Sequence, residues 1–91
     1  MNKPMQLIAT IELTDTFSGE ANYSWVKRKS FNCTGMSDGA IVRKARNLVG
    51  IGGIKTVKSE YGEDIRWDFP GQCVVAFLMF EDSNYFMGEI E

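Results

Sequence analysis

The chain has 91 residues, of which 44% are hydrophobic and 24% are charged, and its formal net charge is −2. A chain of this length and apolar content folds as one domain over residues 1–91 and lies outside the composition of disordered proteins. Histidine is absent, which excludes most hydrolase and zinc-site constellations, because they use that side chain as base or ligand.

The sequence carries no feature of export or membrane insertion. Its first residues lack the apolar stretch and the small-residue cleavage site of a secretory signal. The longest apolar run, residues 73–80, is far shorter than the roughly 18 residues needed to cross a bilayer. We therefore expect a cytoplasmic protein that does not span a membrane.

The first third of the chain predicts a β-hairpin. Apolar residues alternate with more polar ones from Met5 to Thr14, which is typical of a half-buried strand. Residues 15–20 are rich in turn formers, and alternation resumes over residues 21–33. The two segments are therefore expected to pair as antiparallel strands.

An amphipathic helix of about three turns is predicted next. Residues 34–38 break the alternation and offer an N-cap, and Gly50 supplies a stop signal. Gly50, Gly52 and Gly53 follow a predicted helix and precede a predicted strand. A phosphate-binding loop has the reverse order, so these glycines indicate a C-cap. The apolar positions at helical spacing are Ile41, Ala45, Leu48 and Val49.

The remaining segments are β-like. Residues 54–61 predict a polar edge strand, residues 65–69 a strand with one apolar face, and residues 72–81 a central strand covered on both faces. The order strand, strand, helix, strand, strand, strand predicts an α+β fold. In it, an antiparallel sheet of four to five strands has one amphipathic helix packed on a face.

The cysteines and aromatic residues are interpreted as packing residues. Cys33 and Cys73 lie in strand-like apolar segments, which favours buried, reduced thiols over a disulfide. Aromatic residues at alternating strand positions are more often core than ligand cage. That assignment covers Tyr23, Trp25, Trp67, Phe69, Phe77 and Phe80.

One acidic cluster is a candidate metal site. Glu63, Asp64 and Asp68 lie close together around a turn, where carboxylates can hold a divalent cation. Their spacing does not match a calcium loop, and acidic residues beside a glycine are usually a solvated turn. We therefore predict no metal and no cofactor.

Charge is sorted along the chain. The net charge of residues 27–58 is +7, that of residues 59–91 is −7, and that of residues 1–26 is −2. The basic residues either form a surface for phosphates or an acidic protein, or pair with acidic strands within the sheet or across a dimer. The acidic pI of about 5.1 favours the second interpretation. The candidate binding residues are Lys27, Arg28, Lys29, Arg43, Lys44 and Arg46.

The segment from Thr14 to Arg28 reads TDTFSGEANYSWVKR. It resembles a segment of short uncharacterised proteins carried by phages and other mobile elements. The resemblance covers about a sixth of the chain and implies an accessory protein of mobile DNA. Such proteins often act stoichiometrically on a host or phage partner.

These observations predict a non-enzymatic binding or regulatory module that acts through protein contacts. A small chain with this much apolar surface is also expected to pair as a homodimer across a sheet edge or face. The alternative is a nucleic-acid-binding module that uses the basic region 27–58.

Overall fold

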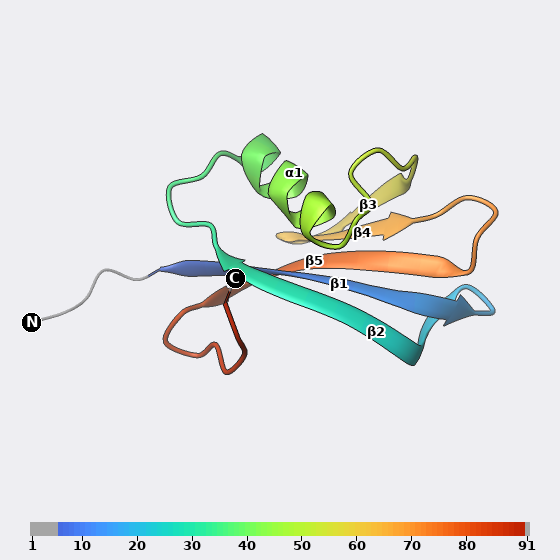
Figure 1. Ribbon diagram of the computed structural model, residues 1–91, viewed down its shortest axis with the longest axis horizontal. Helices are drawn as coiled ribbons and strands as arrows, with labels where there is room; N and C mark the ends of the chain where they lie inside the picture. The colour runs from blue at the N-terminus through green and yellow to red at the C-terminus, as the bar shows by residue number, and fades with distance from the viewer. Residues whose placement is uncertain (1–5, 91) are drawn as a thin grey trace, which may run out of the picture.

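Five antiparallel strands and one helix make up residues 6–90, the part of the chain that the computed structural model describes (Figure 1). The sheet order is β2-β1-β5-β4-β3, so β2 and β3 are the edge strands and β5 is central, as predicted. The predicted α+β fold and element order are confirmed. The elements are β1 (Leu7–Phe17), β2 (Glu20–Asn32), α1 (Asp38–Leu48), β3 (Val57–Tyr61), β4 (Asp64–Asp68) and β5 (Val74–Asp82).

Strand alternation gives the sheet a helix face and an open face. Ala9 and Ile11 of β1 point to the helix face and share a buried core with Ile41 and Ala45 of α1. The intervening residues of β1 point to the open face, which no helix or further strand of residues 6–90 covers (Figure 1). The core on the helix face also contains Phe31, Cys33, Val49, Ile51, Trp67, Phe69, Ala76 and Leu78.

The helix begins and ends where the sequence predicts. Ser37 is the N-cap, and its hydroxyl accepts a hydrogen bond from the backbone N–H of Ala40 at 3.3 Å. At the other end, Gly50 has a φ of 77° and donates to the carbonyl of Asn47, while Ile51 donates to the carbonyl of Arg46. This pair of bonds is a Schellman motif, which needs a residue in the left-handed conformation after the cap.

Two strand boundaries differ from the prediction. The turn between β1 and β2 is only Ser18 and Gly19, both with positive φ, which is the hairpin turn that lets β1 continue to Phe17. The predicted strand over residues 54–61 begins only at Val57. The residues before Val57 form a loop, because the Arg46 guanidinium donates hydrogen bonds to the carbonyl of Ile54 and the hydroxyl of Thr56. Met5, the predicted start of the first strand, lies outside the described residues.

The two cysteines lie in different environments. Cys33 is buried and donates to the carbonyl of Leu7 at 3.4 Å, and burial raises the pKa of its thiol. Cys73 is exposed, so the prediction that it is buried is wrong. It lies just before β5, at the end of the sheet, where its carbonyl accepts a hydrogen bond from the backbone N–H of Thr16 and its side chain is exposed. Both thiols are free.

Within residues 6–90, no helix is long and apolar enough to cross a membrane.

Gly50→Ala is expected to lower the free energy of unfolding by about 1 kcal/mol, because a Cβ strains a backbone with positive φ. Gly53→Ala is the matched control, since Gly53 has ordinary φ and no neighbouring atom within 4 Å of an added Cβ. Urea unfolding of the two variants measures the difference. Equal stability of the two would contradict the role assigned to Gly50.

Candidate binding site on strand β2

Residues 22–28 of β2 are exposed without interruption, where a half-buried strand would expose every second residue. The exposed fraction is 51% for Tyr23, 45% for Trp25 and 46% for Val26. α1 packs over the other end of the hairpin and the open face has no second layer, so neither face is covered here (Figure 1). We call residues 22–28 the β2 surface.

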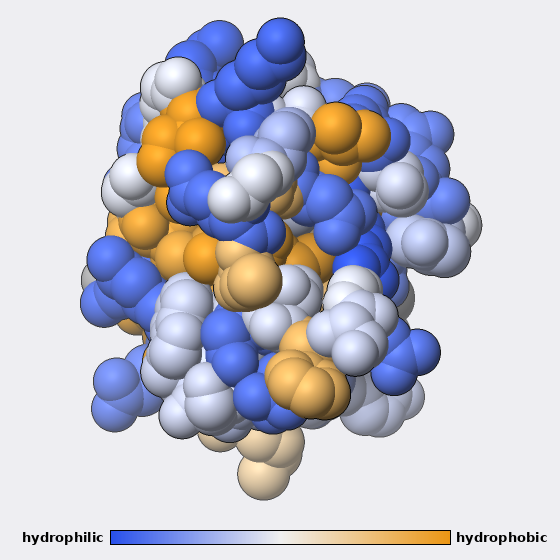
Figure 2. Space-filling model, turned by 90° about the vertical axis from the view of Figure 1, so that its right-hand side faces the viewer, coloured by the Kyte–Doolittle hydropathy of each residue, from blue (hydrophilic) through white to orange (hydrophobic). Residues whose placement is uncertain are grey.

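The β2 surface lies at the end of the molecule that faces the viewer in Figure 2. Figure 2 shows hydrophobic and hydrophilic residues intermixed over this end of the molecule, and the exposed fractions above place Tyr23 and Trp25 at its exterior. The prediction that Tyr23 and Trp25 are core residues is therefore wrong, whereas Trp67 and Phe69 are buried as predicted. Alternation does not say whether anything covers a face of the sheet.

A large bulge shapes the β2 surface. Thr14 pairs with Val26 and Thr16 with Ala21, so four residues of β2 stand opposite the single residue Asp15. The Asp15 carboxylate accepts hydrogen bonds at 2.9 Å from the backbone N–H of Ser24 and from the side-chain amide of Asn22. Hydrogen bonding by the side chain of Ser24, followed by that of Asn22 and, to a smaller extent, by the backbone of Ser24, holds the pKa of Asp15 well below its usual range.

Within the bulge, Tyr23 has a φ of 56°, a left-handed conformation that is rare for a bulky side chain. Its hydroxyl donates to an oxygen of Glu12 at 2.6 Å, and this bond, followed by burial, raises the pKa of Tyr23. The bulge therefore turns an edge-strand side chain back over the sheet.

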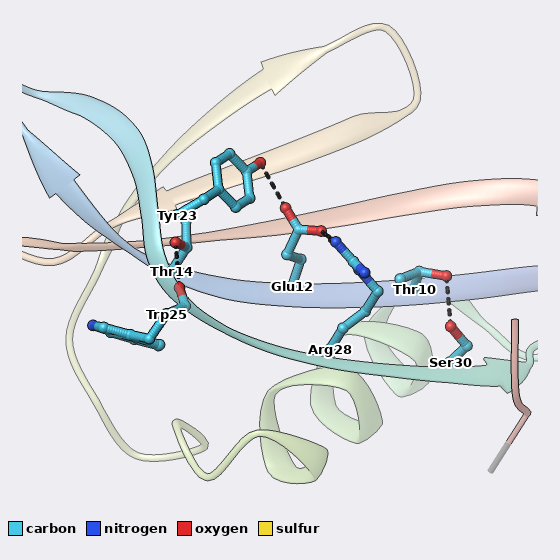
Figure 3. Close-up of polar contacts among 7 residues, drawn as sticks. All are labelled: Thr10, Glu12, Thr14, Tyr23, Trp25, Arg28 and Ser30. Atoms are coloured by element: carbon cyan, nitrogen blue, oxygen red, sulfur yellow. Dashed lines mark hydrogen bonds and ion pairs between the residues drawn. The ribbon is translucent and has the colours of Figure 1, made fainter.

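Glu12 is a buried carboxylate in the centre of the open face. It is only 4% exposed, and Tyr23 and Arg28 reach it from its two sides (Figure 3). Nε of Arg28 donates to the second carboxylate oxygen at 2.8 Å, and a terminal nitrogen of Arg28 bonds the same oxygen. Both oxygens of Glu12 thus have charged or hydroxyl partners, as a buried carboxylate requires.

Further polar contacts surround this cluster. The hydroxyls of Thr10 and Ser30 are 2.7 Å apart, and the hydroxyl of Thr14 donates to the backbone carbonyl of Trp25 at 2.7 Å. Trp25 itself points away from the Tyr23–Glu12–Arg28 cluster (Figure 3). Hydrogen bonds from β1 therefore fix the backbone of the β2 surface at Ser24 and at Trp25.

The predicted basic residues of β2 fall on two faces. Strand pairing puts Lys27 and Lys29 on the helix face, opposite Leu13 and Ile11. Arg28 lies on the open face, where its guanidinium is 55% exposed but bound to Glu12.

The predicted basic residues of α1 also separate. Arg46 donates to the hydroxyl of Thr56 at 2.9 Å, to the carbonyl of Ile51 at 3.1 Å and to the carbonyl of Ile54. Its guanidinium also lies 5.2 Å from the centre of the Trp67 ring, so it holds the loop after the helix. The ammonium of Lys44 lies 5.1 Å from the Phe31 ring centre, and Arg43 is exposed. The sequence could not show that Arg28 and Arg46 have internal partners.

The acidic turn does not form a metal cluster. Asp68 accepts two hydrogen bonds from Nε of Arg66 at 3.1 and 3.2 Å and one from a terminal nitrogen at 3.0 Å. Among residues 6–90, no group of three histidine, cysteine or acidic side chains is placed to hold a metal ion.

Sequence reasoning missed the two acidic residues that organise the site, Glu12 and Asp15. Glu12 carries a detectable signal, because it is a charged residue in the middle of a strand predicted to be half-buried. Asp15 lies in a segment that the sequence predicts to be a turn, and its bonds reach residues seven and nine positions away.

Comparison of the chain with protein-family models, with curated proteins and with solved structures finds no match.

Asp15→Asn is expected to destabilise the fold. Each oxygen of the Asp15 carboxylate accepts one bond, from Ser24 or from Asn22, and the amide of asparagine replaces one oxygen with an NH₂ group that faces a donor. A lowered pKa gives stability that is present above about pH 4 and is lost as the pH falls toward the folded-state pKa. The difference in unfolding free energy between wild type and Asp15→Asn should therefore shrink on acidification. Asp64→Asn, at an exposed residue at the start of β4, is the control, and a pH-independent difference would contradict the assignment.

Tyr23→Phe is expected to cost about 1–2 kcal/mol, because it leaves one oxygen of the buried Glu12 carboxylate without its donor. A raised tyrosine pKa contributes stability below about pH 10 that is lost at higher pH. Urea unfolding at pH 7 measures the loss of stability, and an absorbance titration follows the phenol of Tyr23, whose pKa is raised. Tyr85→Phe, at a residue 72% exposed, should change neither the stability nor the titration of the Tyr23 phenol.

Proposed function

We propose that the chain is a non-enzymatic binding module that docks an extended, acidic segment of a protein partner on the β2 surface. The observation that carries the proposal is the uninterrupted exposure of residues 22–28 on both faces of an edge strand. Tyrosine, tryptophan and arginine, which occur together in this segment, are the residues most enriched at binding hot spots.

The backbone of β2 supports docking of a further strand. The backbone N–H of Cys33 donates to the carbonyl of Leu7 at 2.9 Å, and backbone hydrogen bonding alternates along an antiparallel pair. The same alternation directs the backbone groups of Lys27 and Lys29 to β1. Those of Val26 and Arg28 face the outer edge of the sheet, where an extended peptide can bond them.

The bulge supports the proposal because it orders the aromatic side chains in advance. Asp15 and Glu12 fix the left-handed turn at Tyr23, and Thr14 fixes the carbonyl of Trp25. A side chain that is already ordered loses less conformational entropy when a partner binds.

Charge favours an acidic protein segment over nucleic acid as the partner. Lys27 adjoins the exposed aromatic residues, so an acidic side chain on an added strand can lie beside its ammonium group. The nucleic-acid alternative needs six basic side chains to act together, and Arg28 and Arg46 have internal partners. A stoichiometric binding role also suits the cytoplasmic, mobile-element accessory protein expected from the sequence.

Selection of short random peptides on the immobilised chain tests the proposal. The enriched peptides should be acidic and free of proline in the central positions, because proline cannot donate to an added strand. Trp25→Ala and Lys27→Glu should each weaken a selected peptide at least about tenfold, measured by fluorescence polarisation. Tyr85→Ala, which also removes an exposed aromatic side chain, and Lys55→Glu, which makes the same charge reversal, lie outside the β2 surface and should leave the affinity unchanged.

Two results would overturn the proposal. One is a selection in which acidic peptides are not enriched, and the other is binding that Trp25→Ala does not weaken. Salt-sensitive binding of a labelled single-stranded oligonucleotide that Arg43→Ala abolishes would favour the nucleic-acid alternative.

A further inference from the structure

The opposite edge of the sheet, β3, presents a short segment whose sequence is complementary to itself. The two-residue turn of Gly62 and Glu63 is flanked by the pair Tyr61 and Asp64, which must exchange backbone hydrogen bonds to close the hairpin. Alternation then directs the backbone groups of Val57, Ser59 and Tyr61 to β4. The backbone groups of Lys58 and Glu60 point outward from the sheet.

The direction of the β4 and β5 bonds supports this assignment independently. The N–H of Phe69 donates to the carbonyl of Val74, so the odd-numbered residues of β4 bond β5 and the even-numbered ones bond β3. Arg66 and Asp68 are therefore the partners of Ser59 and Val57, in agreement with the observed register.

We propose that a second copy of this chain pairs antiparallel with β3 about a two-fold axis at Ser59, joining the two sheets into one. In this register Lys58 stands opposite the partner's Glu60, and Glu60 stands opposite the partner's Lys58. Both are residues whose outward backbone groups are free to form a hydrogen-bonded pair. The proposal concerns a different edge from the β2 surface and does not depend on the proposed function.

Side chains on both faces fit the same register. Lys58 and Glu60 lie on the helix face and form an ion pair at 3.0 Å within the chain, with side chains 52% and 65% exposed. Two such pairs related by the axis make a square of alternating charges. On the open face, Val57 and Tyr61, which are 57% and 63% exposed, stand opposite each other across the axis. An aromatic residue facing a β-branched one is a favourable cross-strand pair.

The β2 edge is much less suited to a second copy. Lys27, Arg28 and Lys29 are consecutive, and antiparallel pairing of two β2 strands about Arg28 would place these like charges opposite one another. Consecutive charges on an edge strand are a recognised protection against such pairing. Of the two edge strands, β3 is therefore the one whose charges are complementary to those of a second, antiparallel copy.

The contact is small, because β3 has only five residues. An interface of this size is expected to be weak and reversible, with dimers forming between about 10 µM and about 1 mM. Sedimentation velocity of the whole chain across that range measures the association.

A charge-exchange set tests the register. Lys58→Glu and Glu60→Lys should each shift dimer formation to at least about tenfold higher concentration, because each puts like charges across the axis. An equimolar mixture of the two variants should dimerise again, and so should the chain that carries both substitutions. Circular dichroism confirms that each variant is folded, and Lys55→Glu, a charge reversal in the preceding loop, should dimerise as the wild type does.

Rescue by the mixture and by the double variant is specific to antiparallel pairing about Ser59. Wild type that remains monomeric at about 1 mM would overturn the proposal. Association that Lys58→Glu leaves unchanged, or that the mixture fails to restore, would overturn it equally. Trp25→Ala, which tests the β2 surface, should leave self-association unchanged.

Discussion

The length of the helix relative to the strands is the constraint on which the rest of the structure depends. α1 has 11 residues and extends roughly 16 Å, whereas β2 has 13 residues and extends roughly 40 Å. One such helix can cover only part of one face. The rest of the β1–β2 hairpin, the whole open face and both edges must be stabilised by other means or left accessible, and these are the regions that carry the proposed contacts.

Polar side chains take the place of a second layer on the open face. The carboxylate of Glu12 would be costly to bury alone, but Tyr23 and Arg28 satisfy both of its oxygens and cover it. Further across the same face, Arg66 lies 5.6 Å from the Phe77 ring centre and donates to the carbonyl of Gly19 at 2.9 Å. The bond from Arg66 to Gly19 joins residues far apart in sequence, so it holds the tip of the β1–β2 hairpin to β4.

The two edges of the sheet differ in chemistry, and this difference gives the sorted charge of the chain a structural meaning. β2 carries consecutive basic residues beside exposed aromatic ones, which disfavours self-pairing and suits an acidic partner. β3 alternates one basic and one acidic residue, which suits a second copy. The sorting of charge places a basic strand at one edge and a mixed-charge strand at the other.

The sequence by itself determined the type and order of the elements and the ends of the helix, because alternation, helical periodicity, the Ser37 cap and Gly50 are local signals. It also showed which face each residue of β1 occupies, but not the face of Tyr23, which the bulge turns onto the open face. Only the tertiary structure decided what covers each face, and therefore that Tyr23 and Trp25 are exposed and Glu12 is buried. It also gave Arg28 and Arg46 internal partners and placed β2 and β3 at the edges. Which side chains cover a face, and which polar groups bond each other, depend on contacts between residues distant in the chain, and no local pattern of residue types encodes these contacts.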